Sequence, residues 1–536
     1  MIHDPIYTPA HSYDDVPYPG RAYSQTHPDH MAVLATLLGL TPPPVECCRV
    51  LEIGCAAGGN LVPMALGLPQ AAFVGIDISP RQIAAGNDLI AALRLTNIRL
   101  LVRDILEVDD AFGEFDYIIA HGIYSWVPAA VRDRLMAICK RHLAPNGIAY
   151  VSYNTYPGWH VLGALRDLML HRTAATTDQQ ERARQAMEVL DLLADSEPDG
   201  LNAFGSFFAS YAAMFRTMLN RLGPLRDSFL VHDALEVVNE PVYFAHFAAH
   251  AAQHGLQYLT ETEFPMVLPI GLKPETVDAI RAMSQDGIDL EQYMDFFRGR
   301  QFRQTLLCHD HVAVQRTLRP ERLAGMAVTA LLRPEQQPLD ITSDSPVVFR
   351  NTYDVPFTVA TPISKAALLY LAEESPRAIP FDEVLAVAQQ RLADAGAPMA
   401  DVAPATLARR LGGDLLRAFS TAATLVSFYL YPPHVAQRAG ERPMVTALTR
   451  LEAHAGSEVT NRYHEMIHLD PFDRQLAQFL DGSHDRAALA QAMAGAIATG
   501  QVQPAEHEAP VTTVADLALD VDRRVHWFAQ VALLVQ

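Results

Sequence analysis

The feature that most constrains the fold is a regular alternation of strand-like and helix-like segments between residues 49 and 153. Apolar runs rich in β-branched residues alternate with helical patterns, and short loops with Gly, Asn and Pro separate them. Such an alternation predicts an α/β fold with a doubly wound, Rossmann-like parallel sheet. The expected strands are residues 49–54, 72–77, 98–103, 115–120 and 147–153, and the expected helices are residues 59–68, 79–95 and 128–143.

The first strand runs into the glycine-rich stretch VLEIGCAAGGN at residues 50–60, and an apolar helical pattern follows it. A strand, a glycine turn and a helix present backbone N–H groups and the positive end of a helix to a ligand. A nucleoside triphosphate is excluded, because Gly59 is followed by Asn60 and Leu61 where a phosphate-binding loop needs lysine and a hydroxyl.

A dinucleotide is harder to exclude, since Gly54, Ala56 and Gly59 fit a degenerate G-x-G-x-x-G and the acid Asp77 follows the second strand. Glu52 argues against it, because a carboxylate at the end of the first strand would repel a pyrophosphate. The same carboxylate attracts an ammonium and a sulfonium. The turn therefore favours S-adenosylmethionine as cofactor, with S-adenosylhomocysteine as product.

Ligands of an open parallel sheet bind beyond the carboxyl ends of the strands. Asp77, with Ile78, ends the second strand and is placed to accept hydrogen bonds from both ribose hydroxyls. Asp104, with Ile105, ends the third and is placed to accept from an adenine amino group. One such acid alone is as readily a helix N-cap or a solvated turn. Three acids at successive strand ends, counting Glu52, are a stronger indication of a cofactor site.

Aromatic residues are concentrated in the loops after the fourth and fifth strands, HGIYSWVP (121–128) and YNTYPGWH (153–160). Two of the chain's three tryptophans lie there. Core packing is the alternative for any single ring, but together they predict a wall for a cationic sulfonium or an amine acceptor. Methyl transfer depends chiefly on positioning and exclusion of water, so a base is optional. The candidate catalytic residues are His121 as base, Tyr124, Trp126 and Tyr153, and the candidate substrate-binding residues are Trp126, Tyr156 and Trp159.

Length and composition suggest an intracellular protein of several domains. The 536 residues exceed one ordinary domain. The net charge of −20, without a Lys/Arg run, argues against nucleic acid as a partner. Five cysteines without a disulfide framework or a CxxC pair indicate a reducing cytoplasm. No signal peptide is expected in the first thirty residues, and no stretch of about eighteen apolar residues would insert into a membrane.

Composition changes along the chain predict the domain organisation. A Pro- and Asp-rich joint at 333–346 ends a mainly helical region. Short helices around small β elements beyond it suggest winged-helix-like modules, and because they lack a basic face we expect them to contact protein. The expected parts are an N-terminal lid segment (1–45), a cofactor-binding domain (46–158), a helical middle domain (159–335) and a winged-helix-like C-terminal domain (345–536).

Two stretches contain residue types that bind metals, but neither predicts a metal site. His464-Glu465-Met466-Ile467-His468 matches the H-E-x-x-H signature of zinc proteases. That site needs a continuing helix, and Pro471 follows closely. Cys308-His309-Asp310-His311 lacks a partner cluster. We therefore expect no metal.

Several longer stretches resemble one family. LEIGCAAGGNLVPMA, FVGIDISPRQI, HGIYSWVP and LAPNGIAYVSYNTYPGWH look like the catalytic domain of bacterial protein-lysine methyltransferases that modify outer-membrane proteins. HDALEVVNEPVYFAHF and EQYMDFFRGRQFRQTLLCH are similar to the methyltransferase regulatory domain found beside it. VTNRYHEMIHLDPFDRQLAQFLDGSHDRAAL resembles the family's C-terminal module. The resemblance covers most of the chain.

The resemblance implies N-methylation of protein lysines with S-adenosylmethionine, by an enzyme that often forms homodimers. An outer-membrane or surface protein would be the substrate. A small-molecule or natural-product methyltransferase and a non-catalytic cofactor-sensing protein remain the alternatives. Ala56 departs from the usual turn, where glycine is common. The resemblance places Tyr18, Tyr23, Gln25 and His27 over the methionine end of the cofactor. With the residues already identified at the strand ends, the other expected cofactor-binding residues are Glu52, Gly54, Ala56, Gly58, Asn60, Asp77, Ile78, Asp104, Ile105 and His121.

Overall fold

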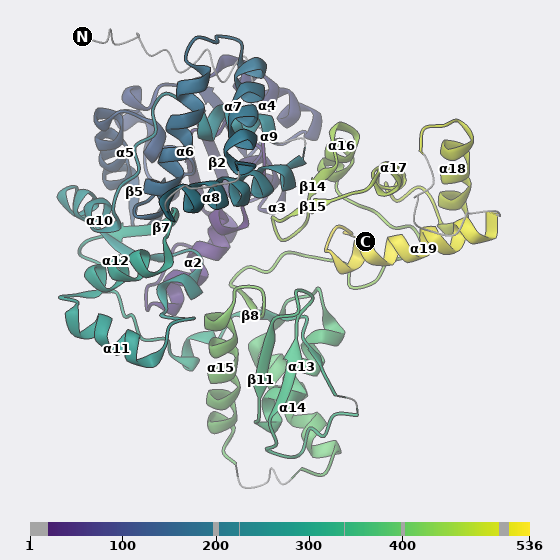
Figure 1. The fold of residues 1–536 in the computed structure, drawn as a ribbon. Helices are drawn as coiled ribbons and strands as arrows, with labels where there is room; N and C mark the ends of the chain where they lie inside the picture. The colour runs from purple at the N-terminus through teal and green to yellow at the C-terminus, as the bar shows by residue number, and fades with distance from the viewer. Residues whose placement is uncertain are drawn as a thin grey trace.

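The structure is a computed structural model. It describes residues 20–196, 203–223, 226–336, 338–397, 402–502 and 514–535. Figure 1 shows a large unit built on the central sheet, a smaller unit with α13 (Pro362–Glu374), α14 (Phe381–Asp394) and α15 (Pro404–Thr421) below it, and a C-terminal unit beside both. Within these residues, no helix combines the length and apolar character needed to cross a membrane.

The central sheet has seven strands in the order β3-β2-β1-β4-β5-β7-β6. β1 to β5 pair in parallel, which confirms the predicted doubly wound sheet. β7 pairs antiparallel with both β5 and β6, so two strands from the expected helical middle domain complete the same sheet. The strands are β1 (Arg49–Ile53), β2 (Ala72–Asp77), β3 (Ile98–Val102), β4 (Phe115–Ala120), β5 (Leu143–Asn154), β6 (Leu256–Glu261) and β7 (Phe302–His309).

Alternate residues of each strand face opposite sides of the sheet, and each side has its own core. Val50 of β1 packs in one cluster with α2 (Pro28–Leu37), α3 (Leu61–Gly67) and α4 (Pro80–Leu93). Its neighbour Leu51 packs in the other cluster with α5 (Ala129–His142) and α10 (Phe244–Gln253). The nearly continuous apolar strands are therefore buried on both faces, as a doubly wound sheet requires.

A buried ion network ties the last two strands to the middle region. The Arg303 guanidinium on β7 bonds Glu261 Oε1 on β6 at 2.9 Å, Glu291 Oε2 at 3.2 Å and Asp295 Oδ2 at 2.8 Å. Glu291 and Asp295 belong to α12 (Gly287–Arg298), which follows α11 (Pro274–Met283). Buried charges are tolerated only when they are paired in this way. A separate helical core joins α6 (Gly158–Thr173), α7 (Gln179–Ala194) and α8 (Ala203–Arg221).

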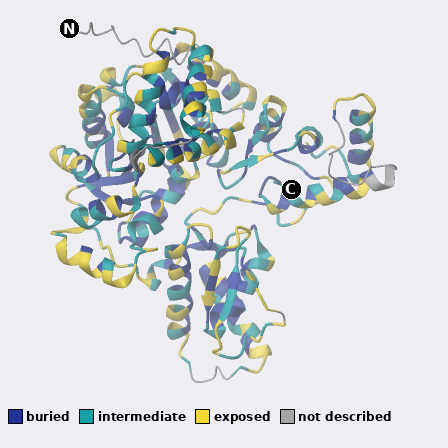
Figure 2. Ribbon diagram, viewed as in Figure 1, coloured by how far each residue is buried: buried dark blue, intermediate teal, exposed yellow. Residues whose placement is uncertain are grey.

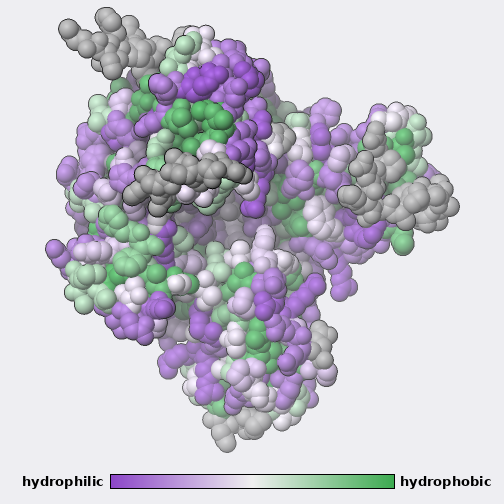
Figure 3. All heavy atoms as spheres, in the orientation of Figure 1, coloured by the Kyte–Doolittle hydropathy of each residue, from purple (hydrophilic) through white to green (hydrophobic). Residues whose placement is uncertain are grey.

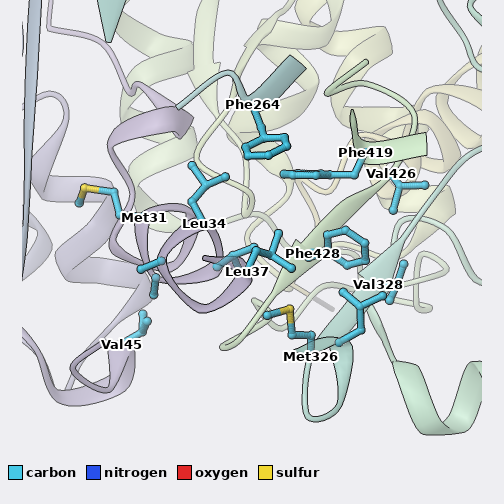
Figure 4. Packing of buried hydrophobic residues seen from close by; sticks show 14 of the residues in the cluster. Met31, Leu34, Leu37, Val45, Phe264, Met326, Val328, Phe419, Val426 and Phe428 are labelled. Carbon is cyan, nitrogen blue, oxygen red and sulfur yellow. The ribbon is translucent and has the colours of Figure 1, made fainter. Parts of the chain in front are cut away.

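Helix α2 lies between the sheet and the unit around α13, α14 and α15. Figure 4 shows Leu34 and Leu37 of α2 close to Phe264, Phe419 and Phe428. The backbone N–H groups of Leu430 and Tyr431 both donate to the buried Asp29 carboxylate of α2, at 3.0 and 2.7 Å. The strands of this unit are β8 (Ala327–Thr329), β9 (Arg333–Pro334), β10 (Val347–Arg350), β11 (Pro356–Val359), β12 (Ile379–Pro380) and β13 (Ser427–Tyr429).

The C-terminal unit has its own apolar core and one β-hairpin. Its helices bury one face each, as the buried and exposed stripes of Figure 2 show. The hairpin projects back toward the central sheet (Figure 1). The elements are α16 (Ala447–Ala455), β14 (Glu458–Thr460), β15 (Met466–His468), α17 (Pro471–Phe479), α18 (Arg486–Ala498) and α19 (Val514–Gln530).

Candidate functional site

The glycine-rich turn after β1 has a backbone that few residues adopt. Gly54, Ala56 and Gly58 have φ values of 73°, 47° and 75°. A left-handed conformation costs a residue with a Cβ about 1 kcal/mol or more. At Ala56 the backbone N–H donates to Asp77 Oδ2 at 2.9 Å, and Ser79 N–H donates to Asp77 Oδ1 at 2.9 Å. The acid that ends β2 therefore holds the turn that follows β1.

Asn60, at the end of this turn, is a buried junction of hydrogen bonds. Its Nδ2 donates to Glu52 Oε1 at 2.8 Å and to Thr26 Oγ1 at 2.9 Å. Its Oδ1 accepts from the Tyr23 N–H at 3.0 Å and lies 2.8 Å from His464 Nε2. One amide thus joins the end of β1, the N-terminal segment and the C-terminal unit.

The other oxygen of Glu52 carries the strongest indication of a ligand. Glu52 Oε2 is buried and has no hydrogen-bond partner among the described residues. Burial, aided by the nearby Asp77 charge, raises the pKa of Glu52 to about 8, although the Asn60 hydrogen bond opposes this. A buried, unpaired carboxylate oxygen is unfavourable unless a cation completes it. It fits the ammonium of a methionine moiety.

The N-terminal segment covers the turn at van der Waals distance. A Cβ added to Gly59 would lie 2.5 Å from the Gly20 backbone, so only glycine allows this approach. The Tyr23 ring lies 4.0 Å from the His121 ring, centroid to centroid. His27 caps α2 by accepting from Asp29 N–H at 3.2 Å. Gln25 hydrogen bonds the Tyr150 hydroxyl. Tyr18 lies outside the described residues.

Asp104, after β3, lies in a region with exposed apolar side chains from the ends of β2 and β3. Asp104 Oδ1 accepts from Leu106 N–H at 2.9 Å and caps a short helical turn that starts at Ile105. Ile78, Val102 and Leu106 are exposed hydrophobic residues. Apolar surface beside a hydrogen-bonding carboxylate suits a flat heteroaromatic ring. Asp104 thus caps this helical turn, and a carboxylate in that position can still accept a hydrogen bond from an adenine amino group.

His121 is partly buried and uncharged at neutral pH. Its Nδ1 lies 2.8 Å from the Tyr150 hydroxyl, and its ring lies 6.3 Å from the Phe302 ring in an edge-on arrangement. Burial lowers the pKa of His121 to about 4. A neutral imidazole can accept a proton, but a pKa this low makes it a weak general base at pH 7.

The aromatic residues of the two loops separate into two groups. Trp126 and Trp159 meet edge-to-face with ring centroids 6.5 Å apart, and Tyr156 stacks on His160 at 4.1 Å. Tyr124 and Tyr153 instead belong to the core between the sheet, α5 and α10. The Tyr124 hydroxyl lies 2.9 Å from His250 Nδ1, and the Tyr153 hydroxyl lies 3.1 Å from Thr305 Oγ1. In this structure both tyrosines therefore make core contacts.

The H-E-x-x-H stretch forms a turn and the following strand β15, not a continuous helix. His464 lies in that turn with φ of 61°, and its buried ring reaches Asn60. The sequence does not predict this role, because 404 positions separate the two residues. Cys308 and His309 are buried in β7, and His309 Nε2 lies 3.0 Å from the Leu143 carbonyl oxygen.

The fold and this edge of the sheet define a class I methyltransferase that uses S-adenosylmethionine. Glu52 Oε2, the Asp77 carboxylate and the apolar surface beside Asp104 fit its ammonium, ribose and adenine parts. When bound, the cofactor supplies a methyl group on a positively charged sulfur.

Three family models match the chain in succession: a methyltransferase domain at residues 51–149, a predicted methyltransferase regulatory domain at 226–309, and the PKMT C-terminal winged helix domain at 441–525. An uncharacterized protein of Rickettsia prowazekii is 32% identical over 500 residues, covering 91% of this chain and 87% of that protein. A second one is 34% identical over 248 residues, covering 46% and 96%.

The structure of PKMT2 from Rickettsia typhi in complex with AdoHcy matches with a TM-score of 0.85 at 27% identity, covering 97% of this chain and 100% of that one. The chain belongs to this family, the bacterial protein-lysine methyltransferases (PKMT). The resemblance expected from the sequence is thereby confirmed, as are the winged-helix C-terminal domain and the cofactor.

Proposed function

We propose that the protein transfers a methyl group from S-adenosylmethionine to the Nζ atom of lysine side chains in a protein substrate. The observation that carries this is the Trp126–Trp159 pair, whose rings come from the segment after β4 and from the first turn of α6, and meet 6.5 Å apart. β4 is the neighbour of β1 in the sheet and β5 is the next strand, so both rings follow strands close to the proposed cofactor residues at the end of β1. Tyr156, which precedes α6, stacks on His160 and lies 5.3 Å from the Tyr243 ring.

Uncharged aromatic walls suit a lysine acceptor. The ammonium is attracted to ring faces as it arrives. It must then lose its proton before its nitrogen can attack, and a desolvating site lowers its pKa. The nitrogen forms a bond to the methyl carbon as the bond to sulfur breaks, so alignment and exclusion of water supply most of the rate. In this proposal His121 positions Tyr23 and has a minor role as a base.

The site's assembly supports a protein acceptor over a small molecule. It takes residues from the N-terminal segment, the sheet and the C-terminal hairpin, since Tyr23, Glu52 and His464 all meet at or beside Asn60. A closed small-molecule pocket needs no such distant winged-helix unit. Outer-membrane and other surface proteins are the proposed substrates, because the resembled family modifies them.

The test is to incubate the enzyme with tritiated S-adenosylmethionine and a lysate. We expect label in acid-precipitable protein, and no label with Asp77→Ala, which should bind S-adenosylhomocysteine far more weakly. Label only in small molecules would favour a natural-product methyltransferase. No label anywhere, with cofactor binding intact, would favour the cofactor-sensing alternative.

A further inference from the structure

Away from the cofactor edge, two histidines and an aspartate converge on one point at the surface of the sheet unit. His250 and His254 are one turn apart on α10, and Asp133 lies on α5. The Nε2 atoms of His250 and His254 are 3.5 and 2.9 Å from the same oxygen, Asp133 Oδ1. The three ligand atoms all lie within 4.8 Å of one another.

These distances suit a shared transition-metal ion. Ligands about 2.0–2.1 Å from a tetrahedral Zn²⁺ are about 3.3 Å apart, close to the two separations between nitrogen and oxygen. Neutral imidazole and carboxylate are ligands that Zn²⁺ accepts, and Ni²⁺ and Cu²⁺ share the preference for imidazole. Asp133 is exposed, which leaves a path for entry and an open coordination position.

The other ring nitrogen of His250 already has the kind of partner that metal-bound histidines use. His250 Nδ1 lies 2.9 Å from the hydroxyl of Tyr124, which is buried. Such a hydrogen bond fixes the ring so that Nε2 faces the metal. Arg132 is the nearby cation, and its charge is paired with Glu240. One histidine would be enough to form an ion pair or hydrogen bond with Asp133. The second histidine, directed at the same carboxylate oxygen, is more than such a pair requires.

We propose that Asp133, His250 and His254 form a binding site for a transition-metal ion such as Zn²⁺, which clips α5 to α10. The site is independent of the cofactor residues, and it goes beyond the proposed methylation. Through Tyr124 it also holds the loop after β4, which carries Trp126. The sequence predicts no metal here, because 121 positions separate Asp133 from His254.

The test uses the full chain without a polyhistidine tag, stripped of metal and titrated with Co²⁺. We expect one Co²⁺ per chain, with visible absorption bands of the intensity typical of four-coordinate cobalt, displaced by Zn²⁺. His254→Ala and Asp133→Asn should weaken binding about tenfold or more. His246→Ala removes an exposed histidine from the same helix outside the cluster and should leave binding unchanged.

Zn²⁺ should also raise the melting temperature of the natural chain and of His246→Ala, but not of His254→Ala, because a ligand stabilises only the fold that binds it. This second readout separates a lost ligand from a misfolded variant. Absence of saturable Co²⁺ binding, or equal binding by the natural chain and His254→Ala, would overturn the proposal.

Discussion

At the scale of single residues, Glu52 couples cofactor binding to pH. Burial raises the pKa of its carboxyl to about 8 in the ligand-free protein. A bound ammonium would lower that pKa, so below pH 8 binding must release a proton. The affinity for S-adenosylhomocysteine should therefore rise as pH increases, by up to about tenfold per unit between about pH 6 and 7.5.

Calorimetry across this range measures the effect. Glu52→Gln keeps the shape of the side chain but has no proton to lose, so its weaker binding should show little dependence on pH. An equal dependence on pH in the natural chain and in Glu52→Gln would assign the effect to another group.

Trp126 is the residue whose loss should separate turnover from cofactor binding. Trp126→Ala removes one half of the edge-to-face pair with Trp159. Turnover should fall about a hundredfold, because the acceptor is no longer held in line. The affinity for S-adenosylhomocysteine should stay within a few fold. Trp126→Phe keeps an aromatic face and should retain most of the turnover. A fall in activity that only matches a fall in the folded fraction would instead indicate core packing.

Local patterns predicted the residues at the strand ends, because a strand, its glycine turn and the acid beside it are contiguous in sequence. Glu52, Asp77 and Asp104 lie at those ends in the structure. The burial of Tyr124 and Tyr153 was not predictable in the same way. Which face of the sheet these tyrosines enter depends on α10, whose His250 lies 126 positions after Tyr124.

At the scale of elements, the β14–β15 hairpin connects the C-terminal unit to the cofactor turn. His464 reaches Asn60, Arg21 pairs with Glu458 at 2.7 Å, and the Ala22 N–H lies 3.4 Å from Met466 Sδ. His464 holds a left-handed backbone, a strain that persists only where the surroundings impose it. The hairpin therefore stabilises the N-terminal segment over the turn.

His464→Asn tests this connection, since asparagine tolerates the left-handed backbone but is too short to replace the imidazole. Loss of one buried hydrogen bond costs about 1–3 kcal/mol, so S-adenosylhomocysteine should bind about tenfold more weakly. The control is His468→Asn on the same hairpin, where the side chain is exposed. Equal affinities of the two variants would show that the hairpin does not support the cofactor site.

The parallel half of the sheet was predictable and the antiparallel half was not. β1 to β5 follow one another with a helix or a short loop between them, so their period is visible in the sequence. β6 and β7 lie within a region of helices and join the sheet beside β5 only through long-range pairing. The buried partners of Arg303, which are Glu261 on β6 and Glu291 and Asp295 on α12, help to specify that pairing.

At the scale of the whole molecule, the helices after β5 present an apolar face. Phe207, Met214 and Met218 of α8 are 48%, 59% and 42% exposed, and Leu192 of α7 is 73% exposed. Figure 3 shows hydrophobic residues gathered over the helices of this region. Residues 207, 214 and 218 recur at helical spacing and share one side of α8. An exposed apolar face of this kind is typical of an interface.

We propose that this face pairs two copies of the chain, as the family resemblance implies. Light scattering after size exclusion should give the mass of a dimer. Met214→Asp with Met218→Asp places charges on the face and should give the mass of a monomer with unchanged melting behaviour. A natural chain that is monomeric at micromolar concentration would contradict this proposal. A double variant that dimerises as tightly as the natural chain would also contradict it.

The account depends most on the atom that receives the methyl group, and the identity of the labelled amino acid tests it directly. Substrate protein labelled with tritiated S-adenosylmethionine is hydrolysed in acid, and the amino acids are separated. We predict that the label elutes with methylated lysines and is absent with Asp77→Ala. Label in methylated arginine, or label lost in mild alkali as carboxyl esters are, would contradict the lysine proposal while leaving the methyltransferase assignment intact.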